Sequence, residues 1–161
     1  MEFRARTTNR IVVLRKASEV LENWQFILEG LTALNETSKG KMFMPPEIFF
    51  RIIMDTLARG ETYGIFALMQ SKNGKNVGFF LVKDDTEKFF VPTACVWAAY
   101  STNNNTEITK DMIVLGEEWA RAQGYKQYYA ICLRTGASIK RLYTKKWRFS
   151  LQGLIFKKEL S

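Results

Sequence analysis

The first half of the chain alternates between short β-branched runs and segments in which hydrophobic residues recur at helical spacing. One such segment follows Ser18, a good helix N-cap, and a second follows Pro46, since proline fits the first turn of a helix. Asn73-Gly74 is a strong hairpin signal between two apolar runs. The pattern predicts a strand at 10–15, a helix at 18–35, a helix from 46 that ends at Gly60, and paired strands at 63–69 and 77–82.

The second half continues the alternation with longer elements. The run at 89–99 predicts a long strand, in which Pro92 indicates a bulge or an edge. Asn105 or Thr106 can cap the next helix. Its apolar face consists of Ile108, Met112, Leu115, Trp119 and Ala122. After Gly124-Tyr125 the pattern predicts a buried strand at 128–133, a helix at 138–146 and a last strand at 149–156.

Composition indicates a soluble globular protein. The chain has 161 residues, of which 47% are hydrophobic, enough for a sizeable core. No apolar run approaches the roughly 18 residues that span a bilayer, and the first residues lack the apolar centre of a signal peptide. We therefore expect a cytoplasmic protein that does not enter membranes. The net charge of +8 favours anionic partners such as nucleic acid, an acidic protein or a phosphate-rich cofactor, or serves solubility alone.

Histidine is absent from the sequence, which removes the commonest general base and the commonest metal ligand. A Ser-His-Asp triad, a Cys-His dyad and a HExxH zinc site are therefore excluded. The two cysteines, Cys95 and Cys132, lie in apolar runs without metal-binding or redox spacing. We expect both to be buried, reduced thiols, and we expect no metal site.

Two stretches of the second half resemble a known family. Residues 117–125 (EEWARAQGY) are similar to the end of the third helix of the GNAT N-acetyltransferase superfamily, and 142–149 (LYTKKWRF) to its closing LYxKxGF element, with Arg148 in place of the glycine. The element order β-α-α-β-β-β-α-β-α-β extends the resemblance to nearly the whole chain. It implies one GNAT-like α/β (α+β) domain over residues 1–161, with a mixed central sheet of six to seven strands flanked by four helices.

The resemblance also implies a site for acetyl-CoA as co-substrate. Acyl-pantetheine would enter between the strand that ends at Ala99 and the strand that contains Cys132, and Tyr143 matches the tyrosine that protonates the departing CoA thiolate. The implied cofactor-binding residues are Trp97, Ala98 and Ala99, whose backbone would pair with pantetheine, and Asn104, Asn105, Thr106, Glu107, Ile108, Thr109 and Lys110 around the pyrophosphate turn.

This pyrophosphate turn departs from the family pattern. Glu107 and Thr109 replace two glycines, which normally let backbone N–H groups approach the phosphates closely. The Glu107 carboxylate also brings negative charge near the pyrophosphate unless it turns away. Asn104 replaces a glutamine or arginine and carries no charge. Function therefore depends on the conformation of this turn.

Several side chains outside the turn have more than one interpretation. Tyr143 is either a general acid or a tyrosine that packs its helix onto the sheet. Asp84, Asp85 and Glu87 could accept a proton through water, although exposed turn carboxylates are ordinary. The densest basic cluster could bind the adenosine 3′-phosphate of CoA, form a nucleic-acid patch or be a solvated helix face. It consists of Arg134, Lys140, Arg141, Lys145, Lys146 and Arg148.

Two functions of different classes remain. The first is an acyl-CoA-dependent N-acyltransferase that transfers an acetyl group directly to a primary amine of a small molecule or protein. The second is a GNAT-shaped non-catalytic module that binds nucleic acid or an acidic protein. A phage-type relative that acts on DNA lies between them. The sequence does not predict the acceptor or the oligomeric state.

Overall fold

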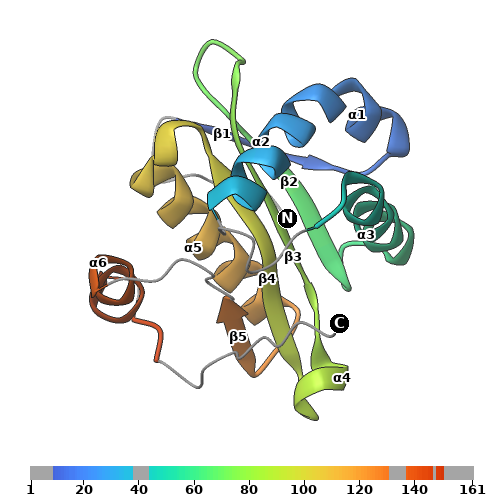
Figure 1. The fold of residues 1–161 in the computed structure, drawn as a ribbon. Helices are drawn as coiled ribbons and strands as arrows, with labels where there is room; N and C mark the ends of the chain where they lie inside the picture. Colours follow the sequence, from blue (N-terminus) through green and yellow to red (C-terminus); the bar gives the residue numbers. More distant parts are fainter. Residues whose placement is uncertain (1–8, 38–43, 131–136, 147, 151–161) are drawn as a thin grey trace, which may run out of the picture.

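The computed structural model describes residues 9–37, 44–130, 137–146 and 148–150. It contains one mixed sheet whose strand order follows the chain (Figure 1). The strands are β1 (Arg10–Leu14), β2 (Gly64–Gln70), β3 (Asn76–Asp84), β4 (Thr93–Ser101) and β5 (Gln127–Ala130). The first four are antiparallel, and β5 runs parallel to β4. The predicted fold class is confirmed.

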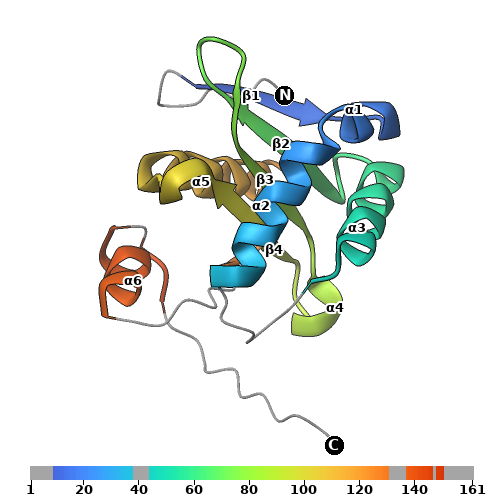
Figure 2. The ribbon, with the colours of Figure 1, turned by 45° about the horizontal axis from the view of Figure 1, so that its top comes forward.

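Helices cover both faces of the sheet. The described helices are α1 (Ala17–Glu22), α2 (Trp24–Thr37), α3 (Pro46–Arg59), α4 (Thr86–Phe89), α5 (Thr106–Ala122) and α6 (Ala137–Arg141). A 3₁₀ turn, η1 (Thr102–Asn104), precedes α5, and a π-helical segment, η2 (Leu142–Lys146), follows α6. Figures 1 and 2 show α2 and α3 on one face and α5 on the other. The result is a three-layer arrangement.

The described residues form five strands, where six to seven were predicted. The predicted strand at 149–156 has no counterpart at Phe149 and Ser150, and its other residues lie outside the described part. The predicted strand at 128–133 is present as β5 up to Ala130, and 131–133 also lie outside it.

The predicted helix at 18–35 is two helices that meet at Asn23, and its cap is Lys16 rather than Ser18. Glu19 accepts hydrogen bonds from the backbone N–H groups of Arg15 and Lys16 at 2.6 and 2.9 Å, which starts the helix earlier. The Asn23 side chain donates to the Glu19 carbonyl and so competes with the helical ladder. Its Oδ1 accepts from Asn76 at the start of β3, which fixes the break against the sheet.

The predicted strand at 89–99 begins only at Thr93. Residues 86–89 instead form α4, because the Asp84 carboxylate accepts from the Thr86 N–H at 2.7 Å and turns the chain. Phe90 ends α4 with a left-handed backbone, φ 60°, and its side chain is 92% exposed. Pro92 therefore precedes the strand, where its missing N–H costs no sheet hydrogen bond.

Each face of the sheet has its own apolar core. Residues of α5, chiefly Met112, Leu115 and Trp119, pack on one face, and residues of α1–α3, such as Phe49 and Ile53, pack on the other. Cys95 is buried in β4 and forms no disulfide, and burial raises the pKa of its thiol to about 12. Its burial is as predicted. Cys132 lies outside the described residues.

Gly116 allows α5 and β5 to approach closely. Tyr128 of β5 crosses this glycine and donates its hydroxyl to the Ile113 carbonyl at 3.0 Å. A Cβ at Gly116 would overlap the Tyr128 hydroxyl and would lie 2.6 Å from Cζ of Phe80. Burial around the phenol raises the pKa of Tyr128 well above its usual value. This contact sets the position of β5, and with it the edge of the predicted cofactor site.

Across the described ranges, no helix is long and apolar enough to cross a bilayer. The same residues contain no group of three or more Cys, Asp or Glu side chains arranged to hold a metal ion.

Candidate active site

The turn between β4 and α5 takes its shape from asparagines. Asn103 and Asn104 have φ values of 56° and 50°, in the left-handed region that most residues avoid. Asparagine tolerates this region better than other non-glycine residues because its short amide can bond locally. The two asparagines thus provide a conformation that glycine often provides. Glu107 and Thr109, which replace the family glycines, lie within the regular helix.

Asn105 caps α5. Its side-chain oxygen accepts hydrogen bonds from the backbone N–H groups of Glu107 at 3.0 Å and Ile108 at 3.2 Å. Sequence patterns left Asn105 and Thr106 as alternatives, and Asn105 is the cap. These two N–H groups are among those that a helix N-terminus can offer to an anion. A phosphate at this point would therefore have to replace the Asn105 carboxamide.

Hydrogen bonds from hydroxyl groups stabilise the turn between β4 and α5. The Ser101 hydroxyl lies 3.0 Å from the Asn105 carbonyl oxygen and 3.1 Å from the Thr109 hydroxyl. Thr109 also donates to the Asn105 carbonyl at 3.1 Å, and its N–H bonds to the same oxygen. The last residue of β4 and the first turn of α5 are thus held together, so the start of α5 has a fixed place at the end of the strand.

The Glu107 carboxylate is bound by Lys146 of η2, with 3.0 Å between Oε1 and Nζ. The hydrogen bond from Lys146 and the charges of Lys146 and Lys110 lower the pKa of Glu107. Both side chains are about half exposed, so the pair contributes little to stability. Its effect is on the local charge, because the carboxylate near the turn has a cation as partner.

β4 carries a β-bulge at Trp97. Leu81 of β3 pairs with Ala98, and the next residue, Val82, pairs with Val96, so Trp97 is the extra residue. Bulges of this kind bend a strand and redirect its side chains. On the other edge, β4 pairs with β5 from Thr93 to Val96. The partner residues after Ala130 lie outside the described residues, including those of the predicted cleft around Cys132.

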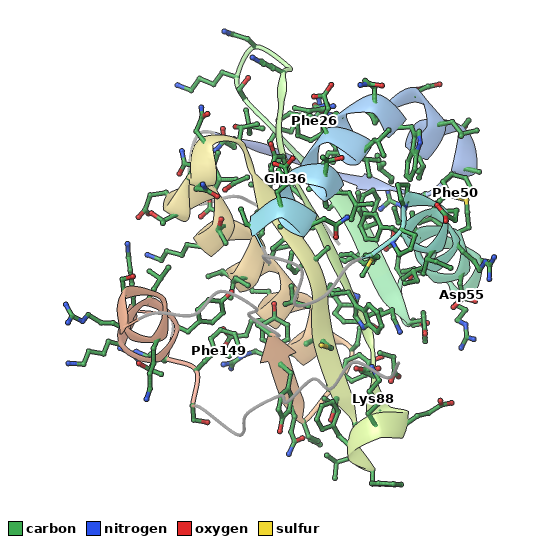
Figure 3. All side chains as sticks on the ribbon, in the orientation of Figure 1. Phe26, Glu36, Phe50, Asp55, Lys88 and Phe149 are labelled. Atoms are coloured by element: carbon green, nitrogen blue, oxygen red, sulfur yellow. The ribbon has the colours of Figure 1, made fainter. Side chains whose placement is uncertain are left out.

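Two cations lie near the Trp97 indole. The Nζ atoms of Lys83 and Lys88 are each 4.7 Å from its ring centroid, at cation–π distance. Figure 3 labels Lys88 on α4. The indole Nε1 is buried and has no hydrogen-bond partner in the described part of the chain. Trp97 and Ala98 pack toward the α1–α3 face, and Ala99 toward α5.

Tyr143 lies in η2 and is half-buried. Its ring centroid is 5.7 Å from that of Phe149, which is 5.8 Å from that of Tyr128 in β5. Phe149 lies beside β5 in Figure 3 and links the two tyrosines. The predicted acid is therefore placed next to the strand that would line the acyl-CoA cleft.

The three carboxylates suggested as bases differ in surroundings. Burial would raise the pKa of Asp84, but hydrogen bonds from Thr86 and Tyr125 outweigh it and lower that pKa. Asp85 is buried and pairs with Lys88 at 3.0 Å. Asp84 and Asp85 thus shape the turn into β4. Glu87 lies on the exposed side of α4.

Arg148 lies shortly after η2 at a position that favours glycine, with a φ of 59°. The Phe149 N–H donates to the Tyr143 carbonyl at 2.9 Å across this residue, and their rings touch, as in a helix C-cap. A side chain at such a left-handed position costs about 1 kcal/mol relative to glycine. A glycine would adopt this backbone without that cost.

Comparisons with solved structures identify the architecture. A ribosomal-protein-alanine N-acetyltransferase from Brucella melitensis biovar Abortus 2308 superposes with a TM-score of 0.65 at 13% identity, over 95% of this chain and 99% of that one. Glucosamine-6-phosphate N-acetyltransferase from Arabidopsis thaliana superposes at 0.63 with 12% identity, over 96% and 100%. The chain has the GNAT fold.

An aminoglycoside acetyltransferase from an uncultured soil metagenomic sample, solved with sisomicin, has the same GNAT architecture, with a TM-score of 0.64 at 14% identity over 96% of this chain and 97% of that one. No family model matches the sequence, and no curated protein matches it. The similarity to these N-acetyltransferases is therefore a similarity of fold, at low sequence identity.

Three features of this site are not predicted by sequence patterns. Capping rules predict Asn105 as a cap, but only the folded turn shows that its carboxamide occupies two N–H groups that a phosphate would need. The left-handed backbone of Arg148 has no sequence signal of its own, because arginine does not favour this region. The indole Nε1 of Trp97 has no sequence signal, since its burial depends on α4 and β3.

Proposed function

We propose that this chain is an acyl-CoA-dependent N-acyltransferase that transfers an acetyl group from acetyl-CoA to a primary amine within a ternary complex. Support comes from the parallel β4–β5 pair, from α5 beginning just beyond β4, and from the N-acetyltransferases that share the fold. The acceptor would be an amine of a small molecule or protein.

The ion pair between Glu107 and Lys146 carries this proposal. A free carboxylate in the first turn of α5 would repel a pyrophosphate, and Lys146 offsets that charge at 3.0 Å. The turn can then bind a phosphate if the Asn105 carboxamide rotates and releases the N–H groups of Glu107 and Ile108. Lys110, one helical turn after Glu107, adds a positive charge at the same end.

Each residue has a defined task in the proposed reaction. Backbone groups of Trp97, Ala98 and Ala99 pair with the pantetheine amides, as a strand pairs with an added strand. The acceptor nitrogen attacks the thioester carbon, so that a C–N bond forms, the C–S bond breaks and the nitrogen loses a proton to water. The Tyr143 hydroxyl donates a proton to the departing thiolate, and water returns a proton to the phenolate before the next turnover.

Titration calorimetry with acetyl-CoA tests the proposal. We expect binding in the micromolar range, and the absence of heat at high micromolar ligand would contradict it. Tyr143→Phe should lower kcat for acetyl transfer without weakening acetyl-CoA binding. Tyr129→Phe is a matched control in β5, and it should leave kcat unchanged.

One observation favours a second function, a non-catalytic GNAT-shaped module that binds nucleic acid or an acidic protein. The Asn105 carboxamide already occupies two N–H groups that phosphate would need. A filter-binding salt titration with DNA and RNA distinguishes this function, because phosphate contacts make affinity fall steeply with salt. Negligible affinity at low salt would contradict the nucleic-acid version.

A further inference from the structure

Cations and aromatic rings alternate beside the β-bulge of β4. The Arg59 guanidinium carbon lies 4.5 Å from the centroid of the Tyr63 ring, and Nζ of Lys83 lies 5.4 Å from the same centroid. The Nζ atoms of Lys83 and Lys88 each lie 4.7 Å from the centroid of the Trp97 ring. These five residues form the cation–aromatic cluster. They come from α3, the turn after it, β3, α4 and β4, so only the folded chain brings them together.

Lys83 is the cation of this cluster that has no ion pair among the described residues. Its Nζ donates to two uncharged oxygens, the Tyr63 hydroxyl and the Asp84 carbonyl, both at 3.3 Å. The Asp84 carboxylate instead accepts hydrogen bonds from the Thr86 N–H at 2.7 Å and the Tyr125 hydroxyl at 2.9 Å. An ammonium group has three donors. Lys83 therefore retains an unneutralised charge and a donor for an anion.

The other two cations of the cluster have carboxylate partners. Arg59 pairs with Asp55 at 3.1 Å, and Lys88 pairs with Asp85 at 3.0 Å. Figure 3 labels Asp55 on α3 and Lys88 on α4. The Lys88 side chain is 55% exposed, so its ammonium group can turn toward a ligand without leaving the surface. The cluster as a whole thus has one positive charge in excess.

Two lysines beside one indole are unfavourable without an anion. Because both Nζ atoms lie 4.7 Å from the Trp97 centroid, they are at most about 9 Å apart, where like charges still repel in about 0.1 M salt. The Trp97 Nε1 is also buried without a hydrogen-bond partner among the described residues, which costs further free energy. A bound anion would offset the repulsion.

The cluster is distant from the turn proposed to bind pyrophosphate. Lys83 pairs with Cys95 near the start of β4, whereas α5 begins after Ser101 at the end of the strand. The strand from Cys95 to Ser101 is roughly 20 Å long, at about 3.3 Å per residue. Figure 1 shows α4 and the start of α5 at opposite ends of β4. An anion at the cluster is therefore a different group from a pyrophosphate at α5.

We propose that the acceptor is an amine that carries an anionic group, a carboxylate or a phosphate, and that Lys83 and Lys88 bind this group beside the Trp97 indole. The inference rests on the proposed function, in which the Trp97 backbone pairs with pantetheine and its side chain lies next to the thioester. Lysine is a flexible point charge that suits either anion. A polycationic acceptor would be repelled by the same residues.

Two matched pairs of acceptors test the proposal in acetyl transfer from acetyl-CoA. They are β-alanine against β-alaninamide and phosphoethanolamine against ethanolamine, with kcat/KM referred to the concentration of unprotonated amine. We expect the anionic member of at least one pair to be preferred about tenfold, as one charge-assisted contact requires. Lys83→Met should bring the ratio toward one, and Lys83→Arg should retain the preference. Lys75→Met, exposed at the β2–β3 turn, is the control for net charge and should leave the ratio unchanged.

A second measurement needs no turnover. The indole N–H resonance of Trp97, assigned from its absence in Trp97→Phe, is followed by NMR during titration with β-alanine and with phosphoethanolamine. We expect one of these anions to shift the resonance in the parent and not in Lys83→Met. If circular dichroism shows that Lys83→Met does not fold, Lys88→Gln gives the same comparison from the exposed side of the cluster.

The outcomes separate this inference from the proposed function. A ratio at or below one for both pairs would overturn the anion site even if acetyl transfer proceeds, and so would a preference that persists in the folded variants Lys83→Met and Lys88→Gln. A shift of Trp97 that depends on Lys83, without any acetyl transfer, would support the anion site and contradict the enzyme. The absence of both transfer and shift would contradict both. A shift caused by oligonucleotides alone would overturn the inference in favour of a nucleic-acid surface.

Discussion

Gly116→Ala perturbs the contact between α5 and β5 on which the candidate site depends. The added methyl group would overlap the Tyr128 hydroxyl and would lie 2.6 Å from Cζ of Phe80. Phe80 is fully buried and cannot move aside, so the displacement falls on Tyr128 and β5. The substitution should therefore push β5 away from α5.

Three free-energy contributions set the magnitude. Alanine favours the helix interior over glycine by about 1 kcal/mol. Overpacking at a tight site costs roughly 1–3 kcal/mol. Loss of the hydrogen bond from Tyr128 to the Ile113 carbonyl costs about 1 kcal/mol more. The net change is a destabilisation of about 2 kcal/mol, which lowers Tm by about 4–8 °C in a chain of this size.

Thermal and urea unfolding of four variants measures this effect. Gly116→Ala combined with Tyr128→Phe should be less destabilised than the sum of the single variants by about 1 kcal/mol, because the overlapping hydroxyl is gone. Gly124→Ala is the matched control. A Cβ there meets nothing within 4 Å, and its cost comes only from a φ of 83°. That cost should be independent of Tyr128.

A Gly116→Ala variant as stable as the parent would refute the reasoning, because helix propensity would then outweigh the contact. Additive effects of the Gly116 and Tyr128 substitutions would refute it as well, since they would place the strain elsewhere.

Three further predictions concern the turn and the buried groups. Asn105→Ala should lower the free energy of unfolding by about 1 kcal/mol, whereas Asn105→Asp keeps the cap; equal stabilities in urea would contradict the capping role. Asp84 has a lowered pKa, so its stabilisation is present above the ordinary aspartate pKa of about 4 and is lost as pH falls through the folded value. The deficit of Asp84→Asn should accordingly shrink in acid urea titrations. Cys95 is buried and its pKa is about 12, so it should react with thiol reagents at pH 8 only after unfolding. A rapid reaction of Cys95 in the native protein would contradict this prediction.

The spacing of hydrophobic residues predicted the fold well, because an element that buries one face needs apolar side chains at regular intervals. Ile108, Met112, Leu115 and Trp119 recur every three or four residues because one face of α5 lies on the sheet, and all four are buried. Ala122, predicted on the same face, is exposed at the end of the helix. The pattern is thus reliable where a face is covered and fails where the helix leaves the sheet.

The site was less predictable because its decisive contacts join distant residues. Glu107 meets Lys146, 39 positions later, and Asn23 breaks a helix against Asn76, 53 positions later. Local patterns contain no information on such pairs. The left-handed angles of Asn103 and Asn104 were not predicted either, because asparagine tolerates this region without requiring it.

The strand order of the sheet, identical to the chain order, has a consequence for how the molecule is made. β2, β3 and β4 join through short connections, so this meander can form soon after it leaves the ribosome. β5 can pair only after α5 has crossed over the sheet. The α5–β5 part of the proposed acetyl-CoA site is therefore added last, onto a sheet that already contains β4. A nascent chain should protect β2–β4 from hydrogen exchange before β5, and ligands should act on the late step alone.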